Sequence, residues 1–211
     1  MPRRLAIDCA TEACSVALFE GDDCIANVHE ILGRGHAERL VPIIASLPQR
    51  GKAEQILVSL GPGSFTGVRI GLATARALGL AWDAQVLGYP TLALVAAMAQ
   101  ERSSTSLTVA MAGGHGEWFV QDFDKSGMPA SIPVSRRPEE AASTISQTVL
   151  AGNRAMELAE LSGDAHEVLD ILPDARKSAL VPLDLLTPRL APIYGRAPDA
   201  KLPGVRKSAP E

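Results

Sequence analysis

The sequence has few aromatic residues, no excess of positive charge and no long apolar run. Phe, Trp and Tyr make up 4% of the 211 residues, so the 46% of hydrophobic residues are mostly small aliphatic side chains. Asp and Glu outnumber Lys and Arg by 24 to 20, and this balance argues against nucleic-acid binding through bulk charge. No run approaches the ~18 apolar residues of a membrane span. Asp8 also comes too early for the apolar core of a signal peptide. We therefore expect a cytoplasmic globular protein with no membrane association.

Cysteine is also scarce, with Cys9, Cys14 and Cys24 as the three examples. A low and odd count excludes a disulfide scaffold and predicts reduced thiols in a cytosolic chain. Structural zinc needs four ligands, and none of the four histidines forms a metal-binding pair. In particular, Leu40 stands where an H-x-x-x-H motif starting at His36 would need its second histidine. We predict no metal and no cofactor.

The order of predicted elements repeats along the chain. Alternation and helical spacing of apolar residues predict three strands, a helix and a strand from Leu5 onward, and the same order begins again at Leu107. In the first half these are strands at 5–7, 15–19, 24–30, 55–60 and 86–87, with helices at 36–47, 65–82 and 91–100, the last capped by Thr91. In the second half they are strands at 107–111, 118–123, 132–135 and 148–150, with a helix from 138.

This twofold order is typical of α/β proteins built from two ribonuclease-H-like lobes, the actin/hexokinase/Hsp70 (ASKHA) superfamily. We assign residues 1–102 to an N-terminal lobe and 103–194 to a smaller C-terminal lobe. The second lobe is predicted to be reduced because prolines interrupt residues 173–192. Residues 195–211 are predicted to form a Pro-rich basic tail.

The most specific motif is the glycine-rich turn of residues 61–71, GPGSFTGVRIG, which leads from a buried strand into a helix. Such turns can place backbone N–H groups on an anion. A P-loop is excluded because Val68 follows Gly67 where a lysine is required, and a nucleophile elbow is excluded because Ser64 occupies the wrong position. The spacing is one residue too long for a dinucleotide fingerprint, which argues against an NADP-dependent oxidoreductase.

The helix that follows carries small residues at every fourth position, namely Gly67, Gly71, Ala75 and Gly79. Residues four apart share one side of a helix, so these form a groove that another backbone can approach closely. The remaining sides are also largely apolar, which predicts burial nearly all round. Two compatible interpretations follow: a core helix packed inside its own lobe, or a helix whose far side meets a partner chain.

The N-terminal hairpin resembles half of a nucleotide site. In ATP-using members of the superfamily, an acid after the first strand and the following turn hold metal and phosphate, and Asp8, Thr11 and Glu12 occupy these positions. The corresponding turn of the second lobe, residues 112–114, has no acid. Mg²⁺ bound to a nucleotide would ordinarily need acids from both lobes. A small-molecule kinase or ATPase is therefore the alternative function, and a hydrogen-bonding role within the turn is the alternative for Asp8.

Residues 8–18 and 61–71, together with the Pro-x-Tyr-x-Arg stretch at 192–196, resemble the TsaB (YeaZ) family of tRNA threonylcarbamoyladenosine biosynthesis proteins. The resemblance implies a non-catalytic relative of TsaD, the subunit that transfers a threonylcarbamoyl group to the adenosine beside the anticodon. It implies a TsaD-type catalytic partner, a TsaE-type ATPase partner, a homodimer when alone, and at most indirect contact with tRNA. One departure is that Met111-Ala112-Gly113 stands near the place of the family's Asp-Ala-Arg.

The resemblance also implies which elements meet the partner. These are the helices at 36–47 and 65–82, and the implied interface residues are His36, Leu40, Ile43, Gly67, Val68, Gly71, Leu72, Ala75 and Gly79. No catalytic residue is implied for this chain.

Overall fold

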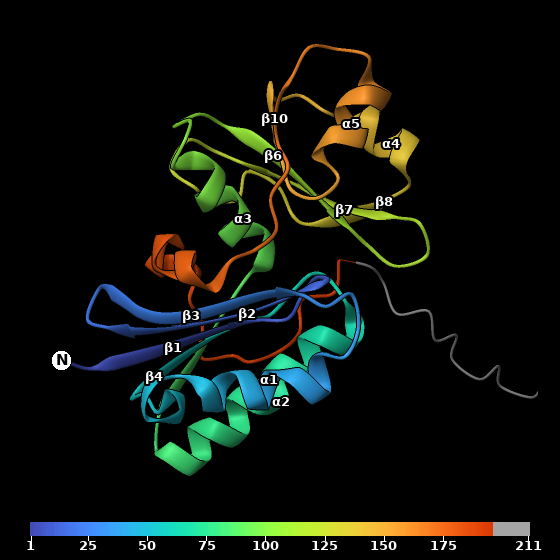
Figure 1. Ribbon diagram of the computed structural model, residues 1–211. Coiled ribbons are helices and arrows are strands. Elements are labelled where there is room, and N and C mark those ends of the chain that lie inside the picture. Colours follow the sequence, from blue (N-terminus) through green and yellow to red (C-terminus); the bar gives the residue numbers. More distant parts are fainter. Residues whose placement is uncertain (196–211) are drawn as a thin grey trace, which may run out of the picture.

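The computed structural model describes residues 1–195, which form two α/β lobes stacked one above the other (Figure 1). The first lobe contains β1 (Arg3–Asp8), β2 (Ala13–Glu20), β3 (Asp23–Ile31), α1 (His36–Ser46), η1 (Pro48–Gly51), β4 (Gln55–Ser59), α2 (Phe65–Trp82), β5 (Gln85–Tyr89) and α3 (Thr91–Gln100). The elements that follow are β6 (Leu107–Ala112), β7 (Trp118–Phe123), β8 (Val134–Arg136), α4 (Pro138–Ala142), β9 (Val149–Ala151), α5 (Ala155–Ser162), β10 (Glu167–Leu169), η2 (Ala175–Leu180) and η3 (Leu183–Leu185). Apart from Gly195, the predicted basic tail lies outside the described residues.

The two lobes share one sheet topology. The strand order is β3-β2-β1-β4-β5 in the first sheet and β10-β9-β6-β7-β8 in the second. In both sheets the first strand pairs antiparallel with the second and parallel with the fourth. This is the two-lobed ASKHA fold predicted from the order of elements.

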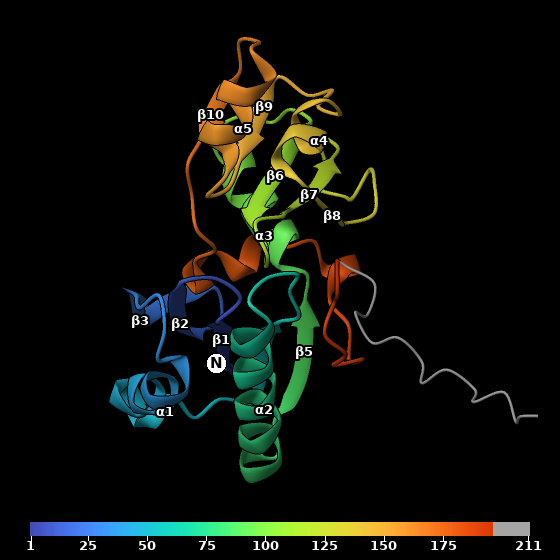
Figure 2. The ribbon, with the colours of Figure 1, turned by 90° about the vertical axis from the view of Figure 1, so that its right-hand side faces the viewer.

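Alternation along the central strands builds the layers of the first lobe. In β1, Leu5 and Ile7 point into the core beneath α1 and α2, whereas Ala6 points into the core beneath α3 and η2. Figure 2 shows α1 and α2 side by side under the sheet. The sheet is therefore covered on both faces, which explains why its parallel strand β4 is almost continuously apolar.

The helix α2 has the predicted bounds because its ends carry local signals. At its start, the Ser64 Oγ accepts a hydrogen bond from the Gly67 N–H at 3.2 Å. The helix ends at Trp82, and the next residue, Asp83, caps it with a left-handed φ of 53°. The predicted cap of α3 is wrong, because Thr91 is already inside that helix and Pro90 precedes it. The Thr91 Oγ1 instead lies 2.5 Å from the Ser59 Oγ, inside the lobe.

The helix α3 lies between the two sheets and joins the lobes. Its Leu92 and Val95 pack into the core of the second sheet, while Leu94 packs into a core of the first. The opposite face of the second sheet is covered by α4 and α5. The second lobe is reduced, as predicted, with three strands of 3 residues and an α4 of 5 residues. Sequence reasoning did not predict α5 and β10, which complete its five-stranded sheet.

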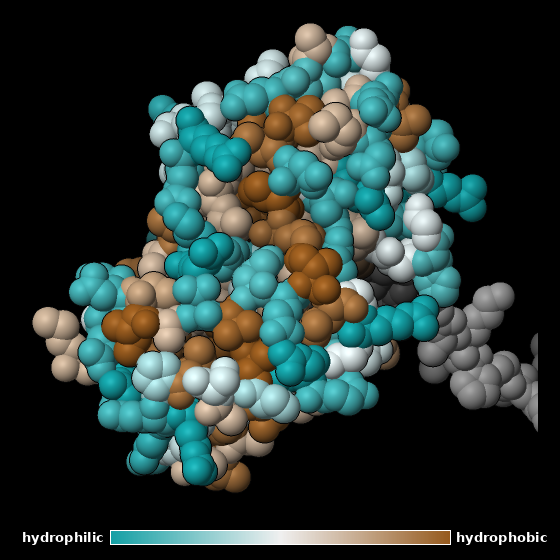
Figure 3. All heavy atoms as spheres, viewed as in Figure 1, coloured by the Kyte–Doolittle hydropathy of each residue, from teal (hydrophilic) through white to brown (hydrophobic). Residues whose placement is uncertain are grey.

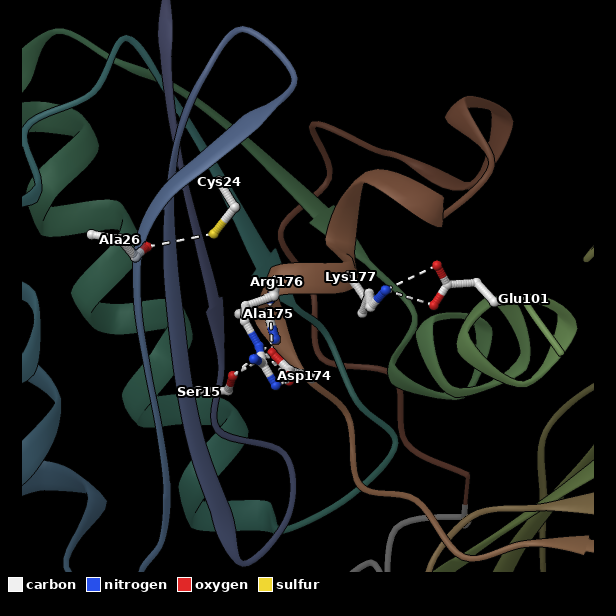
Figure 4. A network of polar contacts seen from close by, with 8 residues as sticks. All are labelled: Ser15, Cys24, Ala26, Glu101, Asp174, Ala175, Arg176 and Lys177. Atoms are coloured by element: carbon white, nitrogen blue, oxygen red, sulfur yellow. Dashed lines mark hydrogen bonds and ion pairs between the residues drawn. The ribbon is translucent and has the colours of Figure 1, made fainter.

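After β10 the chain returns to the first lobe. The Ser15 hydroxyl accepts a hydrogen bond from the Ala175 N–H at 2.8 Å, and Asp174 lies beside it, paired with Arg176 (Figure 4). Further along, Thr187 forms an antiparallel bridge with Gly88 at the free edge of β5. By packing, this proline-broken stretch therefore lies with the first lobe, although it follows the second lobe in sequence.

On the face shown in Figure 3, hydrophobic residues run across the middle, over the junction of the lobes. Among residues 1–195, no helix combines the length and the apolar character needed to cross a membrane.

Candidate functional site

A cleft of about 1000 Å³ opens between the lobes. Its walls come from the β1–β2 turn, the glycine-rich loop before α2, the β6–β7 turn and the stretch around Tyr194. The lining residues are Ala10, Thr11, Glu12, Gly33, Gly63, Ser64, Phe65, Val68, Arg69, Ala112, Gly113, Gly114, His115, Phe119, Ser135, Pro192, Ile193, Tyr194 and Gly195. This position between two ribonuclease-H-like lobes makes the cleft the candidate site.

The glycine-rich loop lies directly on the backbone of the β1–β2 hairpin. A Cβ atom at Gly63 would lie 2.1 Å from the Ala10 carbonyl oxygen, and one at Gly67 would lie 2.0 Å from that of Cys9. The Ser64 N–H donates a hydrogen bond of 2.7 Å to the same Ala10 oxygen. The close backbone approach predicted from the glycine spacing therefore exists, and the approaching backbone belongs to this chain.

The rest of the small-residue stripe also faces its own sheet. A Cβ at Gly71 would lie 3.6 Å from the Val58 Cγ2, and one at Gly79 would lie 2.4 Å from the Val86 Cγ2. The side chain of Ala75 is fully buried. Of the two interpretations of α2, the structure therefore supports a core helix on this side.

The residues predicted to form the partner interface are buried within the lobe. This holds for His36, Leu40, Ile43, Gly67, Val68, Gly71, Leu72, Ala75 and Gly79. Within this chain they are covered by their own sheet, and their role in a partner interface stays a prediction. Any partner contact of α1 and α2 would be made by their exposed sides.

Asp8 lies beneath the cleft rather than in it. Its carboxylate accepts hydrogen bonds from the Ala10 N–H at 2.9 Å and from the Tyr89 hydroxyl at 3.0 Å. Burial raises the pKa of Asp8 from 3.8 to about 6, although these hydrogen bonds act in the opposite direction. The structure thus supports the alternative made for this residue, a hydrogen-bonding role within the turn.

Thr11 and Glu12 do line the cleft, but both are engaged in hydrogen bonds. The Thr11 Oγ1 accepts from the Ala13 N–H at 3.2 Å, within the turn. The Glu12 carboxylate accepts from the Asn153 side-chain amide at 2.9 Å, and this bond connects the lobes. The Asn153 Oδ1 in turn accepts from the Ala112 N–H at 2.8 Å. Asn153 was not predicted, since it carries no local signal beyond following a strand end.

A second connection between the lobes runs through the stretch around Tyr194. The Arg69 guanidinium lies 3.2 Å from the centroid of the Phe65 ring and donates a hydrogen bond of 2.5 Å to the Tyr194 hydroxyl. The backbone N–H of Ile193 donates to a carbonyl of the first lobe, that of Leu60, at 2.8 Å. The Gly195 carbonyl accepts from the second lobe, from the N–H of Ser135, at 2.9 Å. Tyr194 belongs to the motif found in the sequence, but its role as a tie between lobes was not foreseen.

The chemistry available in the cleft is limited. Its titratable lining groups are Glu12, Arg69, His115 and Tyr194. Glu12 is bonded to Asn153, and Arg69 and Tyr194 are bonded to each other. Within residues 1–195, no three His, Cys, Asp or Glu side chains gather in a way that could hold a metal ion. The described lining therefore does not provide the acid from each lobe that nucleotide-bound Mg²⁺ would need.

Comparison with known sequences connects this chain to tRNA modification proteins. Residues 27–163 match the family described as TsaD, tRNA N6-adenosine threonylcarbamoyltransferase. The chain is 38% identical over 135 residues to the tRNA threonylcarbamoyladenosine biosynthesis protein TsaB of Escherichia coli, covering 60% of this chain and 58% of the relative. It is 35% identical over 100 residues to the protein of that name from Bacillus subtilis, covering 44% of this chain and 43% of the relative. The chain thus spans about half the length of the curated relatives that it matches.

Comparison with solved structures agrees with the comparison of sequences. YeaZ from Pseudomonas aeruginosa superposes with a TM-score of 0.77 at 25% identity, covering 92% of this chain and 100% of that chain. The ethanolamine utilization protein EutJ from Carboxydothermus hydrogenoformans superposes with a TM-score of 0.52 at 11% identity, covering 86% of this chain and 90% of that one. The second likeness concerns the fold alone.

Proposed function

The chain belongs to the TsaB (YeaZ) family, and on that premise we propose that it takes part in threonylcarbamoyladenosine biosynthesis on tRNA as a non-catalytic subunit. In this role it supports a TsaD-type catalytic subunit by forming a heterodimer with it, and a TsaE-type ATPase joins the complex. Contact with tRNA is at most indirect, since the chain carries a net charge of -4.

The proposal depends on one observation: the residues at the positions of a nucleotide site form hydrogen bonds within the protein. Asp8 is buried under the turn, and Glu12 is hydrogen-bonded to Asn153 across the cleft. A working phosphotransferase needs its acids free to hold a metal ion. Residues held in this way stabilise a lobe arrangement, which suits a subunit that presents a surface to a catalytic partner.

We place the partner contact on the exposed sides of α1 and α2. The exposed side of α1 carries Ala37, Val41 and Ala45 at spacing four, and that of α2 carries Ala73, Ala77, Leu80 and Ala81. Leu80 is 90% exposed and Val41 is 56% exposed. Small apolar side chains on two neighbouring helices allow another helix to approach closely, and exposed apolar patches mark interaction sites. A second copy of the chain would use the same surface when the partner is absent.

The test is reconstitution with matched variants. Purified chain is combined with its cognate TsaD and TsaE, threonylcarbamoyladenylate and tRNA, and the modified nucleoside is measured. Leu80→Glu should weaken co-elution with TsaD and lower modification at least tenfold. Leu161→Glu, at an exposed site on α5 of the other lobe, serves as the control and should change neither. Full modification by TsaD without this chain would refute the subunit role, and equal effects of the two variants would refute the surface.

The same preparation tests the kinase or ATPase alternative. Under the proposal, the isolated chain shows neither tight ATP binding by calorimetry nor turnover. Tight binding that is abolished by Glu12→Ala would favour the alternative.

A further inference from the structure

Cys9 and Cys14 lie directly beneath the turn that forms part of the cleft. Their Sγ atoms are 3.8 Å apart. Both side chains belong to the core on the α1 and α2 side of the sheet, and each is at most 1% exposed. Asp8 and Ser15 form the last pair of the β1–β2 ladder, so the two cysteines occupy the next opposed positions.

This arrangement lies close to the geometry of a disulfide without having reached it. Opposed residues on antiparallel strands hold their Cβ atoms about 4.5–5.5 Å apart, and a disulfide needs about 3.5–4.5 Å. The Sγ atoms would have to approach from 3.8 Å to about 2.0 Å. This approach requires one end of the hairpin to move, and the two sulfurs are already in direct contact.

We propose that Cys9 and Cys14 are a reversible redox modification site that closes to an intramolecular disulfide when a hydroperoxide is the oxidant. The Cys14 thiol loses its proton, and the thiolate attacks one peroxide oxygen. The O–O bond breaks, the Cys14 sulfenic acid forms, and the leaving hydroxide takes up the proton lost from the thiol to become water. The Cys9 sulfur then attacks the Cys14 sulfur, and the sulfenic oxygen leaves as a second water. The two thiols lose two electrons and two protons in total, and hydrogen peroxide is reduced to water.

The contact between the sulfurs indicates which cysteine reacts with the peroxide and which then forms the disulfide. The hydrogen bond from Cys9 lowers the pKa of Cys14, while the same contact raises the pKa of Cys9. Cys14 is therefore the sulfur that reacts first, because the thiolate is the nucleophile. The third cysteine, Cys24, is exposed on β3 and bonds to the Ala26 carbonyl, so it serves as a comparison.

Closing this bond would reach the cleft through the backbone. The Cys9 carbonyl oxygen is the atom against which Gly67 packs, and the Ala10 carbonyl holds the Ser64 N–H. Tightly packed interiors transmit such shifts because they have no free volume to absorb them. Oxidation would therefore displace the hairpin turn relative to the glycine-rich loop, two of the walls of the cleft.

The experiment uses the full chain with Cys24→Ser, which leaves the pair as its only thiols. Folded protein is treated with hydrogen peroxide, digested without reduction, and mapped by mass spectrometry. We expect a peptide cross-linked between residues 9 and 14, complete loss of titratable thiol after denaturation, and full recovery with dithiothreitol. Cys9→Ser in the same background should trap the Cys14 sulfenic acid without a cross-link, whereas Cys14→Ser should leave Cys9 as a free thiol.

Three outcomes would overturn the proposal. Both thiols could stay free under conditions that oxidise Cys24 in the parent chain. Each could be oxidised separately to sulfinic acid without a cross-link. The cross-link could also form faster in urea than in the folded chain, which would show that the folded arrangement does not favour it.

Discussion

Alanine substitution at two glycines of α2 should have opposite effects on stability. A Cβ at Gly71 would make ordinary contacts of 3.6 to 3.9 Å with Val58, Cys9 and Ile7. Alanine is favoured over glycine inside a helix by about 1 kcal/mol, so Gly71→Ala should stabilise the fold by about that amount. A Cβ at Gly67 would lie 2.0 Å from the Cys9 carbonyl oxygen, a distance that real Cβ contacts do not reach.

The cost at Gly67 follows from what must move. The helix start or the hairpin has to shift by more than 1 Å, which costs about 1–3 kcal/mol as overpacking. The shift also disturbs the Ser64 cap, whose loss costs about 1 kcal/mol. After the gain in helix propensity is subtracted, we expect Gly67→Ala to destabilise the fold by about 2 kcal/mol.

Urea unfolding followed by circular dichroism measures both values, with the slope m showing whether the transition remains the same. The thermal midpoint should fall by about 4–8 °C for Gly67→Ala and rise by about 2–4 °C for Gly71→Ala. Equal stability of the two variants would refute the assignment of the small-residue stripe to internal packing.

Two further predictions concern the cleft. The pKa of Asp8 in the folded protein is about 6, above its ordinary 3.8. The folded state therefore binds the Asp8 proton more tightly than the unfolded state does. The resulting contribution to the free energy of unfolding is present at pH values below ~4 and is lost as the pH rises through 6. Asp8→Asn should therefore gain about 2 kcal/mol of unfolding free energy relative to the parent between pH 4 and pH 7, and a constant difference across a series of urea titrations would contradict this. Asn153→Ala removes the hydrogen bonds to Glu12 and to the Ala112 N–H, which should cost about 2 kcal/mol. It should also speed amide exchange in the β6–β7 turn, and unchanged exchange there would argue against the connection between lobes.

The sequence predicted those elements of the fold whose bounds depend on neighbouring residues in the chain. The bounds of α2 were found because a glycine-rich turn is followed by a run of helical apolar residues, and the structure shows that Ser64 caps the helix. The order of the elements along the chain followed from the spacing of short apolar runs, whereas the order of the strands within each sheet comes from the structure. By contrast, α5 and β10 are short, and their apolar residues become informative only when they are seen against the β6–β9 pair.

The candidate site was predicted less completely, because it depends on distant pairs. The sequence identified Asp8, Thr11 and Glu12 as the positions of a degenerate nucleotide site, and of these Thr11 and Glu12 line the cleft. It gave no sign that Asn153 would reach Glu12, which is 141 residues away in the sequence. Periodicity showed that one side of α2 is filled with small residues, but it could not show whether that side faces its own lobe or a partner. The carbonyl groups of the hairpin, which lie against this side, show that it faces its own lobe.

The return of the chain to the first lobe has a consequence for synthesis on the ribosome. Ser15 meets Asp174, 159 residues later in the sequence, and the core that contains Phe19 and Leu57 is completed by Ala175 and Val181. Chains grow from the N-terminus at about 5–20 residues per second, so this core stays open for seconds after its strands have emerged. The second lobe, begun later, has all of its strands available first. The lobe that is made first is therefore the one that finishes folding last. A chain that stops before residue 175 would leave the apolar sheet face on the α3 side incompletely covered and open to proteases and chaperones.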